Sequence, residues 1–256
     1  IGAGACGLVA ALAAKGAGGG VVVLERDPVP QGSTALSSGL IPAAETKTQR
    51  DQGLKDSAMQ MATDIIKKAH HENDPSMVET VCRQSAVSVD WLNDIHGLNL
   101  TVIESFLYPG HSAHRMHGTP SKTGQELIGA LVRRTEALDI PVITNALVTD
   151  LYVDNDGDIC GVRFNRPDGS IETMGCKALI LACNGYGGNP DMVAEFIPDM
   201  KNALYFGHTG NQGDAIAWGL ELGACLDDLG AYQGHGSVAY PHGILLSWAV
   251  MMEGGI

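Results

Sequence analysis

The stretch that decides the fold is Gly2-Ala3-Gly4-Ala5-Cys6-Gly7, close to the start of the chain, which matches the pattern G-x-G-x-x-G. Strong helix formers follow at residues 8–15 and end at a run of glycines. The short β-branched run at residues 21–25 then ends in an acid, Glu25. In a chain with 33 glycines, the hexapeptide alone could be a packing or turn feature. Because helix, strand and acid come in the right order and spacing, the sequence predicts a dinucleotide-binding βαβ unit.

Each part of this unit has a physical role at a dinucleotide. One glycine makes the tight turn, the next lets the backbone approach the pyrophosphate, and the third lets helix and strand pack closely. The helix N-terminus adds unpaired N–H groups and the positive end of its dipole. We therefore expect Gly4 and Gly7 to lie at the pyrophosphate and Glu25 to accept hydrogen bonds from the adenosine ribose. A carboxylate at that position would repel a ribose 2′-phosphate.

The segment after Glu25 distinguishes between the two common dinucleotides. An NAD domain would continue into a helix soon after its second strand, whereas residues 28–46 are rich in Gly, Ser, Pro and Thr. We interpret these residues as a long functional loop whose small side chains and hydroxyls suit a longer cofactor. This favours FAD, with an NAD-dependent dehydrogenase as the alternative.

The rest of the chain indicates an α/β fold with an inserted antiparallel β-meander. Helices are expected at residues 54–71, after the N-cap Asp74-Pro75, and behind a capping box at residues 123–126. The apolar period then changes to two, with turn signals between the runs. The strand candidates and the last helix are residues 141–144, 148–153, 159–164, 170–174, 178–182 and 214–222.

Charge and cysteine content argue against several kinds of partner. The chain has 16 Lys and Arg against 29 Asp and Glu, a formal net charge of −13. That charge repels phosphate backbones and anionic lipid, so nucleic acid and membrane surfaces are not expected partners. The six cysteines have neither C-x-x-C nor zinc-ligand spacing, and no apolar run approaches the roughly 20 residues that span a bilayer. We expect no metal, no membrane insertion and a reducing, cytoplasmic compartment.

Five motifs in order resemble the FAD-binding family of fumarate reductase and succinate dehydrogenase flavoproteins, which also holds 3-ketosteroid and tricarballylate dehydrogenases. The resemblance covers nearly the whole chain. The matching segments are Gly2 to Gly7 with Glu25, residues 32–44, residues 115–131, residues 179–186, and Gly213-Asp214-Ala215-Ile216 ahead of Gly223-Ala224. Five motifs in this order are far more specific than the glycine hexapeptide alone.

The resemblance implies a Rossmann-like FAD-binding domain at residues 1–229, followed at residues 230–256 by the start of a capping domain that covers the substrate. Succinate dehydrogenases attach their flavin through a His that aligns with Ser33, so we expect noncovalent FAD. The residues that the fingerprint and the resemblance together assign to FAD are Gly2, Gly4, Ala5, Gly7, Glu25, Arg26, Gly32, Ser33, Thr34, Ser37, Ser38, Gly39, Val148, Ala182, Asn184, Gly185 and Asp214.

The two ends of the sequence lead us to expect a fragment. The chain starts with Ile1 in a turn that should follow a strand, and it ends without a stop signal. The family's C-terminal return to the flavin domain, with the arginine that donates a proton in fumarate reductases, is not among these residues.

The resemblance also assigns substrate-site roles near the end of the chain. Gln233-Gly234-His235 is similar to the family's Q-A-H, so His235 would bind a substrate carboxylate; the alternative is a solvated histidine. Ser247 keeps a hydroxyl that could bind a substrate oxygen. Trp248 and Met251 stand where the family has the Glu and Arg that relay protons, and neither side chain can carry a proton.

A second cluster contains His111, His114, Arg115 and His117, with no acidic or Cys partner nearby in the sequence. We interpret it as a solvated or flavin-side loop rather than as a metal or catalytic site.

Together these features predict a flavin enzyme that moves a hydride between flavin N5 and a carbon of an organic acid or ketone. Its expected partners are a small-molecule substrate and an unknown electron donor or acceptor. Besides the NAD-dependent dehydrogenase, a non-catalytic flavin- or nucleotide-binding module stays open as an alternative, because the proton relay is missing.

Overall fold

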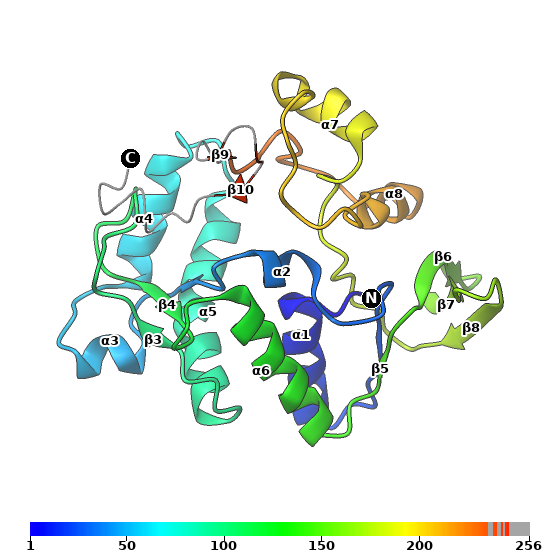
Figure 1. Ribbon diagram of the computed structural model, residues 1–256, viewed down its shortest axis with the longest axis horizontal. Helices are drawn as coiled ribbons and strands as arrows, with labels where there is room; N and C mark the ends of the chain where they lie inside the picture. The colour runs from blue at the N-terminus through cyan, green and yellow to red at the C-terminus, as the bar shows by residue number, and fades with distance from the viewer. Residues whose placement is uncertain (235–237, 240–241, 243, 246–256) are drawn as a thin grey trace.

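A computed structural model of the protein describes residues 1–234, 238–239, 242 and 244–245 (Figure 1). The predicted βαβ unit forms its centre. Helix α1 (Ala5–Gly16) follows the glycine hexapeptide directly, and strand β1 (Val23–Leu24) comes after the glycine run. β1 pairs in parallel with β5 (Val142–Ile143), with Val23 opposite Val142. This pairing confirms both predicted strands.

The N-terminal residues extend this parallel arrangement on the other side of β1. Gly2 donates its backbone N–H to the Leu24 carbonyl at 2.8 Å. Ile1 donates to the Ile180 carbonyl and accepts from the Ala182 N–H, each at 2.8 Å. The predicted strand at residues 178–182 is therefore wrong as a regular strand, but its backbone bonds to Ile1 in a parallel pattern.

Helix α6 (Gly124–Ala137) packs beside α1, and the main core lies around this pair (Figure 1). Leu8, Leu12 and Leu131 are fully or almost fully buried in that core. The predicted capping box at the start of α6 is only half formed. Thr123 accepts from the Glu126 N–H, but the Glu126 carboxylate accepts from Ser121 instead of reaching back to the cap.

The β-meander is confirmed and stands at one end of the molecule (Figure 1). Its antiparallel strands are β6 (Leu147–Val153), β7 (Ile159–Asn165) and β8 (Ile171–Gly175). Val162 and Phe164 are buried in the core while Arg163 between them is more exposed, as the period of two predicts.

Residues 28–46, predicted as one long loop, contain regular structure. Helix α2 (Gly32–Leu36) packs on α6, and strand β2 (Ile41–Pro42) pairs with β4 (Met116–Gly118), which also pairs with β3 (Thr101–Val102). The prediction was wrong because such short elements carry no periodic signal of their own; tertiary pairing stabilises them.

The remaining helices build the layer beside this small sheet and a second group near the end of the chain. Asp74 caps α5 (Pro75–Asp94) with Pro75 at its first position, as predicted, and α4 (Ala58–Lys68) occupies the inner part of the predicted helix at residues 54–71. The last predicted helix, at residues 214–222, is α8 (Asp214–Glu221), whereas α3 (Lys47–Asp51) and α7 (Pro190–Phe196) were not predicted. The remaining elements are a 3₁₀ turn Pro198–Met200, β9 (Val238–Ala239) and β10 (Ile244–Leu245).

Among the described residues, no helix combines the length and the apolar character that crossing a bilayer requires.

Candidate cofactor site

A cavity of about 430 Å³ opens at the N-terminus of α1. It gathers segments that lie far apart in the sequence: the glycine hexapeptide, the end of β1, the start of α2, the start of β6 and the segment around Ala182. The predicted cofactor residues that line it are Gly2, Gly4, Ala5, Glu25, Arg26, Gly32, Ser33, Thr34, Val148, Ala182, Asn184 and Asp214. The fold thus brings most of the predicted set to one place.

The three glycines of the fingerprint have different physical reasons to be glycine. A Cβ on Gly2, whose φ is +98°, would lie 2.5 Å from the Ala182 carbonyl oxygen, and a Cβ on Gly7 would lie 1.8 Å from the Gly2 oxygen. Both clashes are with backbone, so these two glycines are required for packing. A Cβ on Gly4 would meet only the Thr34 hydroxyl, at 3.5 Å. Within the described chain nothing excludes a side chain at Gly4, so the space in front of it is free for a ligand.

The first turn of α1 supplies hydrogen-bond donors to this space. Its N-cap, Gly4, is in an extended conformation and has no side chain to cap the helix. The Ala5 N–H donates to Thr34 Oγ1 at 3.0 Å, so the short helix α2 brings a hydroxyl to the same point. A helix N-terminus with a glycine cap attracts anionic groups such as phosphate.

Glu25 lies in the cavity wall, 5% exposed, at the end of β1. Its Oε2 accepts from the Ala3 N–H at 2.6 Å, and its Oε1 accepts from the Asp27 N–H at 3.0 Å. These bonds hold the carboxylate in one orientation. Each carboxylate oxygen has a second acceptor site, so Glu25 can still receive a hydrogen bond from a ribose hydroxyl.

A polar loop covers the cavity from the side of α8, and sequence reasoning missed it. His208, Gly210 and Asn211 line the cavity together with Asp27. The His208 ring bonds to the Asp27 carboxylate at 2.8 Å, and Arg26 donates to the Gly210 carbonyl at 2.7 Å. Two positions in the sequence could have indicated these residues: residues 208–211 come just ahead of the Gly213-Asp214 motif, and Asp27 comes just after Glu25.

The other predicted cofactor residues do not line this cavity. A Cβ on Gly7 would clash with the Gly2 backbone, and Gly7 is not among the lining residues; its contact with the pyrophosphate stays a prediction. Ser37 and Gly39 form a turn against the start of α6, where the Ser37 carbonyl accepts from the Gly124 N–H at 2.8 Å. Their contact with FAD stays a prediction, as does that of Ser38 and Gly185.

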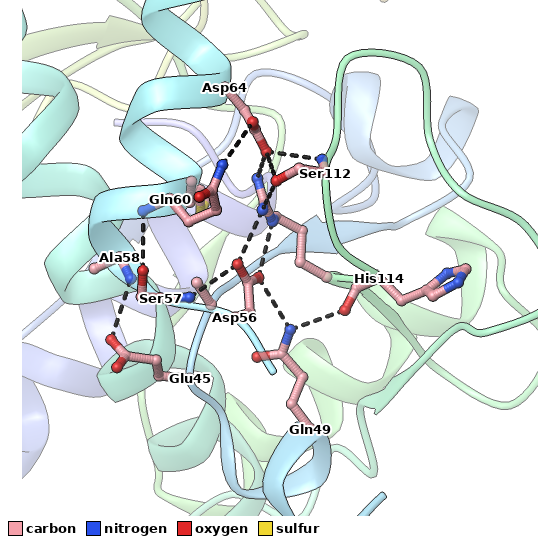
Figure 2. Close-up of polar contacts among 12 residues, drawn as sticks. Glu45, Gln49, Asp56, Ser57, Ala58, Gln60, Asp64, Ser112 and His114 are labelled. Atoms are coloured by element: carbon pink, nitrogen blue, oxygen red, sulfur yellow. Dashed lines mark hydrogen bonds and ion pairs between the residues drawn. The ribbon is translucent and has the colours of Figure 1, made fainter. Parts of the chain in front are cut away.

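The cluster around Arg115 contains a buried ionic network, so the expectation of a solvated loop without acidic partners is wrong, while its position beside the flavin stays a prediction. Arg115 is 1% exposed and bonds Asp56 through Nε and Nη2, each at 2.9 Å, and Asp64 through Nη1 at 2.7 Å. Both acids belong to a segment about 55 residues earlier in the chain. In the folded protein they lie beside Arg115, and Asp64 also accepts hydrogen bonds from Ser112 (Figure 2). The pairing is tertiary, and no local pattern announces it.

Hydrogen bonds satisfy the remaining groups of this network. Burial alone would raise the pKa of Asp64, but the N–H and hydroxyl of Ser112 and the Arg115 guanidinium outweigh it and hold that pKa at about 2. Gln49 joins Asp56 to the His114 carbonyl (Figure 2). The network therefore ties the residues after β2 to the loop before β4.

His117 is fully buried beside the same network. Its Nδ1 lies 2.9 Å from the Arg115 carbonyl and its Nε2 lies 2.8 Å from the Thr46 hydroxyl. A carbonyl can only accept, so Nδ1 carries the proton and Nε2 accepts. Burial lowers the pKa of His117, which keeps the ring neutral. His117 is thus a satisfied core histidine.

Two further predictions concern metal binding and the substrate. Within the part of the chain that the structure describes, no group of three His, Cys, Asp or Glu side chains is arranged to hold a metal ion. His235 and Ser247, the predicted catalytic residues, lie outside the described residues, as do Trp248 and Met251.

The cavity wall fits an adenine dinucleotide. It combines the N-terminus of α1, where the N-cap Gly4 has no side chain and leaves its approach open, with a buried carboxylate and the hydroxyls of Ser33 and Thr34. These groups match a pyrophosphate and a ribose in both charge and hydrogen-bonding capacity.

Comparison with known proteins agrees with this geometry. The profile of the family described as FAD binding domain matches residues 1–256. A probable fumarate reductase of Shewanella frigidimarina is 31% identical over 257 residues, which cover 100% of this chain and 43% of that protein. A urocanate reductase of Eggerthella lenta is 32% identical over 232 residues, covering 90% of this chain and 38% of that protein.

The solved structures give the same result for the fold. The open conformation of a flavocytochrome c3 fumarate reductase superposes with a TM-score of 0.88 at 29% identity, over 97% of this chain and 44% of that one. A 3-ketosteroid dehydrogenase from Rhodococcus jostii matches in fold with a TM-score of 0.78. The chain spans less than half the length of the curated relatives described above.

Proposed function

The chain belongs to the FAD binding domain family, and from that premise we propose that it holds the cofactor of an oxidoreductase that transfers a hydride between flavin N5 and a carbon of an organic acid or ketone. The observation that carries the proposal is the cavity at the N-terminus of α1, where only Gly4 of the fingerprint glycines is free of a packing reason. Because the family binds FAD, its match over the whole chain argues against the alternative of an NAD-dependent dehydrogenase.

The residues of the cavity wall have separable tasks in this proposal. The first turn of α1 and Gly4 receive the pyrophosphate, because the helix end offers N–H donors and the glycine leaves room. Glu25 orients the adenosine ribose through its hydroxyls. The hydroxyls of Ser33 and Thr34, which also line the cavity, add neutral hydrogen bonds. When bound, FAD supplies the redox chemistry, while these side chains bind and orient it.

We propose an unsaturated carboxylic acid as the substrate class, bulkier or less anionic than fumarate. The relatives named above are called fumarate and urocanate reductases, so the class is common to them. The family resemblance assigns the substrate's polar end to His235 and Ser247, in a capping domain that would begin at residues 230–256. By the same resemblance, Trp248 and Met251 stand where fumarate reductases have two proton-relay residues, and Trp248 would make this part of the site more apolar.

The test is a steady-state assay of the full-length protein, which should purify yellow with flavin absorption. Reduced viologen would supply electrons to fumarate, urocanate, larger enoates and ketones in parallel. We expect turnover of a bulkier acid and poor turnover of fumarate, because Trp248 would add apolar surface to the site and Met251 would lack the positive charge of the family's Arg. Reduction of either acid needs a proton besides the hydride, and since neither Trp248 nor Met251 can relay it, another group of the full-length protein must supply it. Fumarate turnover of about 10² s⁻¹ would show that the role given to Trp248 is wrong.

The same assay also tests the alternative that the protein is a non-catalytic flavin-binding module. It would retain flavin but reduce none of these acceptors, and an artificial electron acceptor with saturated substrates would give no turnover either.

A further inference from the structure

Two segments about 180 residues apart meet directly over the cofactor cavity. One is residues 26–33, which follow β1, and the other is residues 208–211, which precede α8. Side chains or backbone of both segments line the cavity. A molecule that fills the cavity would therefore be enclosed between them.

Four hydrogen bonds join these two segments. The His208 Nε2 lies 2.8 Å from Asp27 Oδ2, and Arg26 Nη1 donates to the Gly210 carbonyl at 2.7 Å. Ser33 Oγ accepts from the His208 N–H at 3.1 Å and from the Asn211 amide at 2.9 Å. None of these residues except Arg26 and Ser33 belongs to the set that the sequence motifs assigned to FAD.

The hydrogen-bond pattern defines the state of the His208 ring. Its Nδ1 accepts from the Gly210 N–H at 3.0 Å, so the ring proton is on Nε2, which donates to Asp27. The Asp27 backbone is held in turn, because its N–H donates to Glu25 and its carbonyl accepts from Asn145. The His208 ring thus connects the loop at residues 208–211 to Asp27, whose backbone is held by hydrogen bonds on both sides.

The two halves of this contact differ in burial. Asn211 is 7% exposed and also bonds the Tyr205 hydroxyl, so it fixes the base of the loop. The His208 and Asp27 side chains are 25% and 29% exposed. The outer pair is therefore reached by water and is the part that can open without unpacking the core.

We propose that residues 208–211 form a clasp over the bound cofactor, and that the His208–Asp27 pair controls how fast FAD leaves. The inference rests on the proposed function, because the enclosed ligand is FAD. Departure of the adenosine and pyrophosphate requires the two walls to separate, and the outer pair must break first. Breaking it by mutation leaves Gly4, Glu25 and the α1 N-terminus unchanged, so the effect falls on release.

The experiment uses full-length protein loaded with FAD. The release rate is measured by diluting the holoprotein and following free flavin in ultrafiltrates over time. The variants are Asp27→Ala, His208→Ala and the double variant. The control is Asp168→Ala, which removes an exposed acid from the turn between β7 and β8 that does not line the cavity. We expect about five-fold faster release in each single variant, the size typical of one partly exposed hydrogen bond, and no change in the control.

The double variant separates a clasp from two independent contacts. Since the pair acts as a unit, we expect the double variant to release FAD about as fast as the faster single variant. Multiplication of the two effects, to about 25-fold, would overturn the clasp. So would wild-type release rates combined with a lower thermal midpoint of the apoprotein, which is the signature of a purely structural pair. Wild-type protein that holds no flavin would overturn the proposed function and this inference together.

Discussion

The cofactor cavity and the Arg115 network are both polar regions, but they handle their polar groups in opposite ways. In the network, the buried Arg115 and Asp56 form an ion pair, and Gln49 and Ser112 hydrogen-bond to Asp56 and Arg115, respectively. At the cavity, α1 begins without a side-chain cap and Gly4 faces open space. Groups that the chain satisfies by itself stabilise the fold, whereas groups directed at a cavity indicate a ligand.

The largest expected effect tests the Arg115 network, whose polar groups are satisfied within the chain. Replacing Arg115 with Met keeps most of the side-chain volume but leaves the Asp56 and Asp64 carboxylates buried without their counter-ion. We expect the free energy of unfolding of the full-length protein to fall by about 3–5 kcal/mol in denaturant titrations. The matched control is Arg163→Met, whose pair with Asp150 is exposed, and which should cost less than about 1 kcal/mol. Equal losses in the two variants would remove the distinction.

The second prediction tests the cofactor cavity. Gly4→Val should lower FAD affinity by about 100-fold or more, because the new side chain occupies the approach to the pyrophosphate, and such a loss corresponds to about 2.7 kcal/mol. Its fold should persist, since the Cβ meets only the Thr34 hydroxyl and the backbone is extended. Flavin-to-protein absorbance ratios and circular dichroism measure the two outcomes.

Gly7→Ala is the contrasting variant for that experiment. Its Cβ would lie 1.8 Å from the Gly2 oxygen, so folding itself should fail. Normal flavin content in Gly4→Val would contradict the assignment of the pyrophosphate to this helix end.

A smaller effect concerns the pH dependence of stability. The folded pKa of Asp64 is about 2, below its ordinary value of 3.8, so the unfolded state binds more protons between these two values. Its contribution is therefore fully present above about pH 4 and is lost as the pH falls through 2. Between pH 6 and pH 3 we expect a loss of about 1 kcal/mol from this group. Urea titrations of Asp64→Asn should lack that share of the pH dependence; an unchanged slope would contradict it.

The smallest expected effect is on flavin attachment, where we expect no covalent bond. The family resemblance aligns Ser33 with the flavin-linking His, and the Ser33 Oγ accepts hydrogen bonds from His208 and Asn211 in the wall of the cavity. Acid precipitation of full-length holoprotein should thus release all flavin into the supernatant. Flavin fluorescence in the pellet would show an attachment elsewhere, with His208 the first residue to examine by peptide mapping.

The βαβ unit, the meander and about half of the cavity wall could be predicted from the sequence, because each has a signature within a single stretch of chain. The pattern from Gly2 to Glu25 and the alternation around Phe164 each lie within one continuous segment. The short elements α2 and β2 lack such a signature, and so they were taken for loop. Their stability comes from α6 and β4, which are remote in the sequence.

The sequence by itself therefore determined the fold family and the cofactor, because glycine geometry and apolar period are local properties of the backbone. Only the tertiary structure decided that Arg115 is buried between two acids, and that His208 meets Asp27 over the cavity. These outcomes depend on distances between segments up to about 180 residues apart. No short-range pattern encodes such distances, since they are set by how the helices and strands pack.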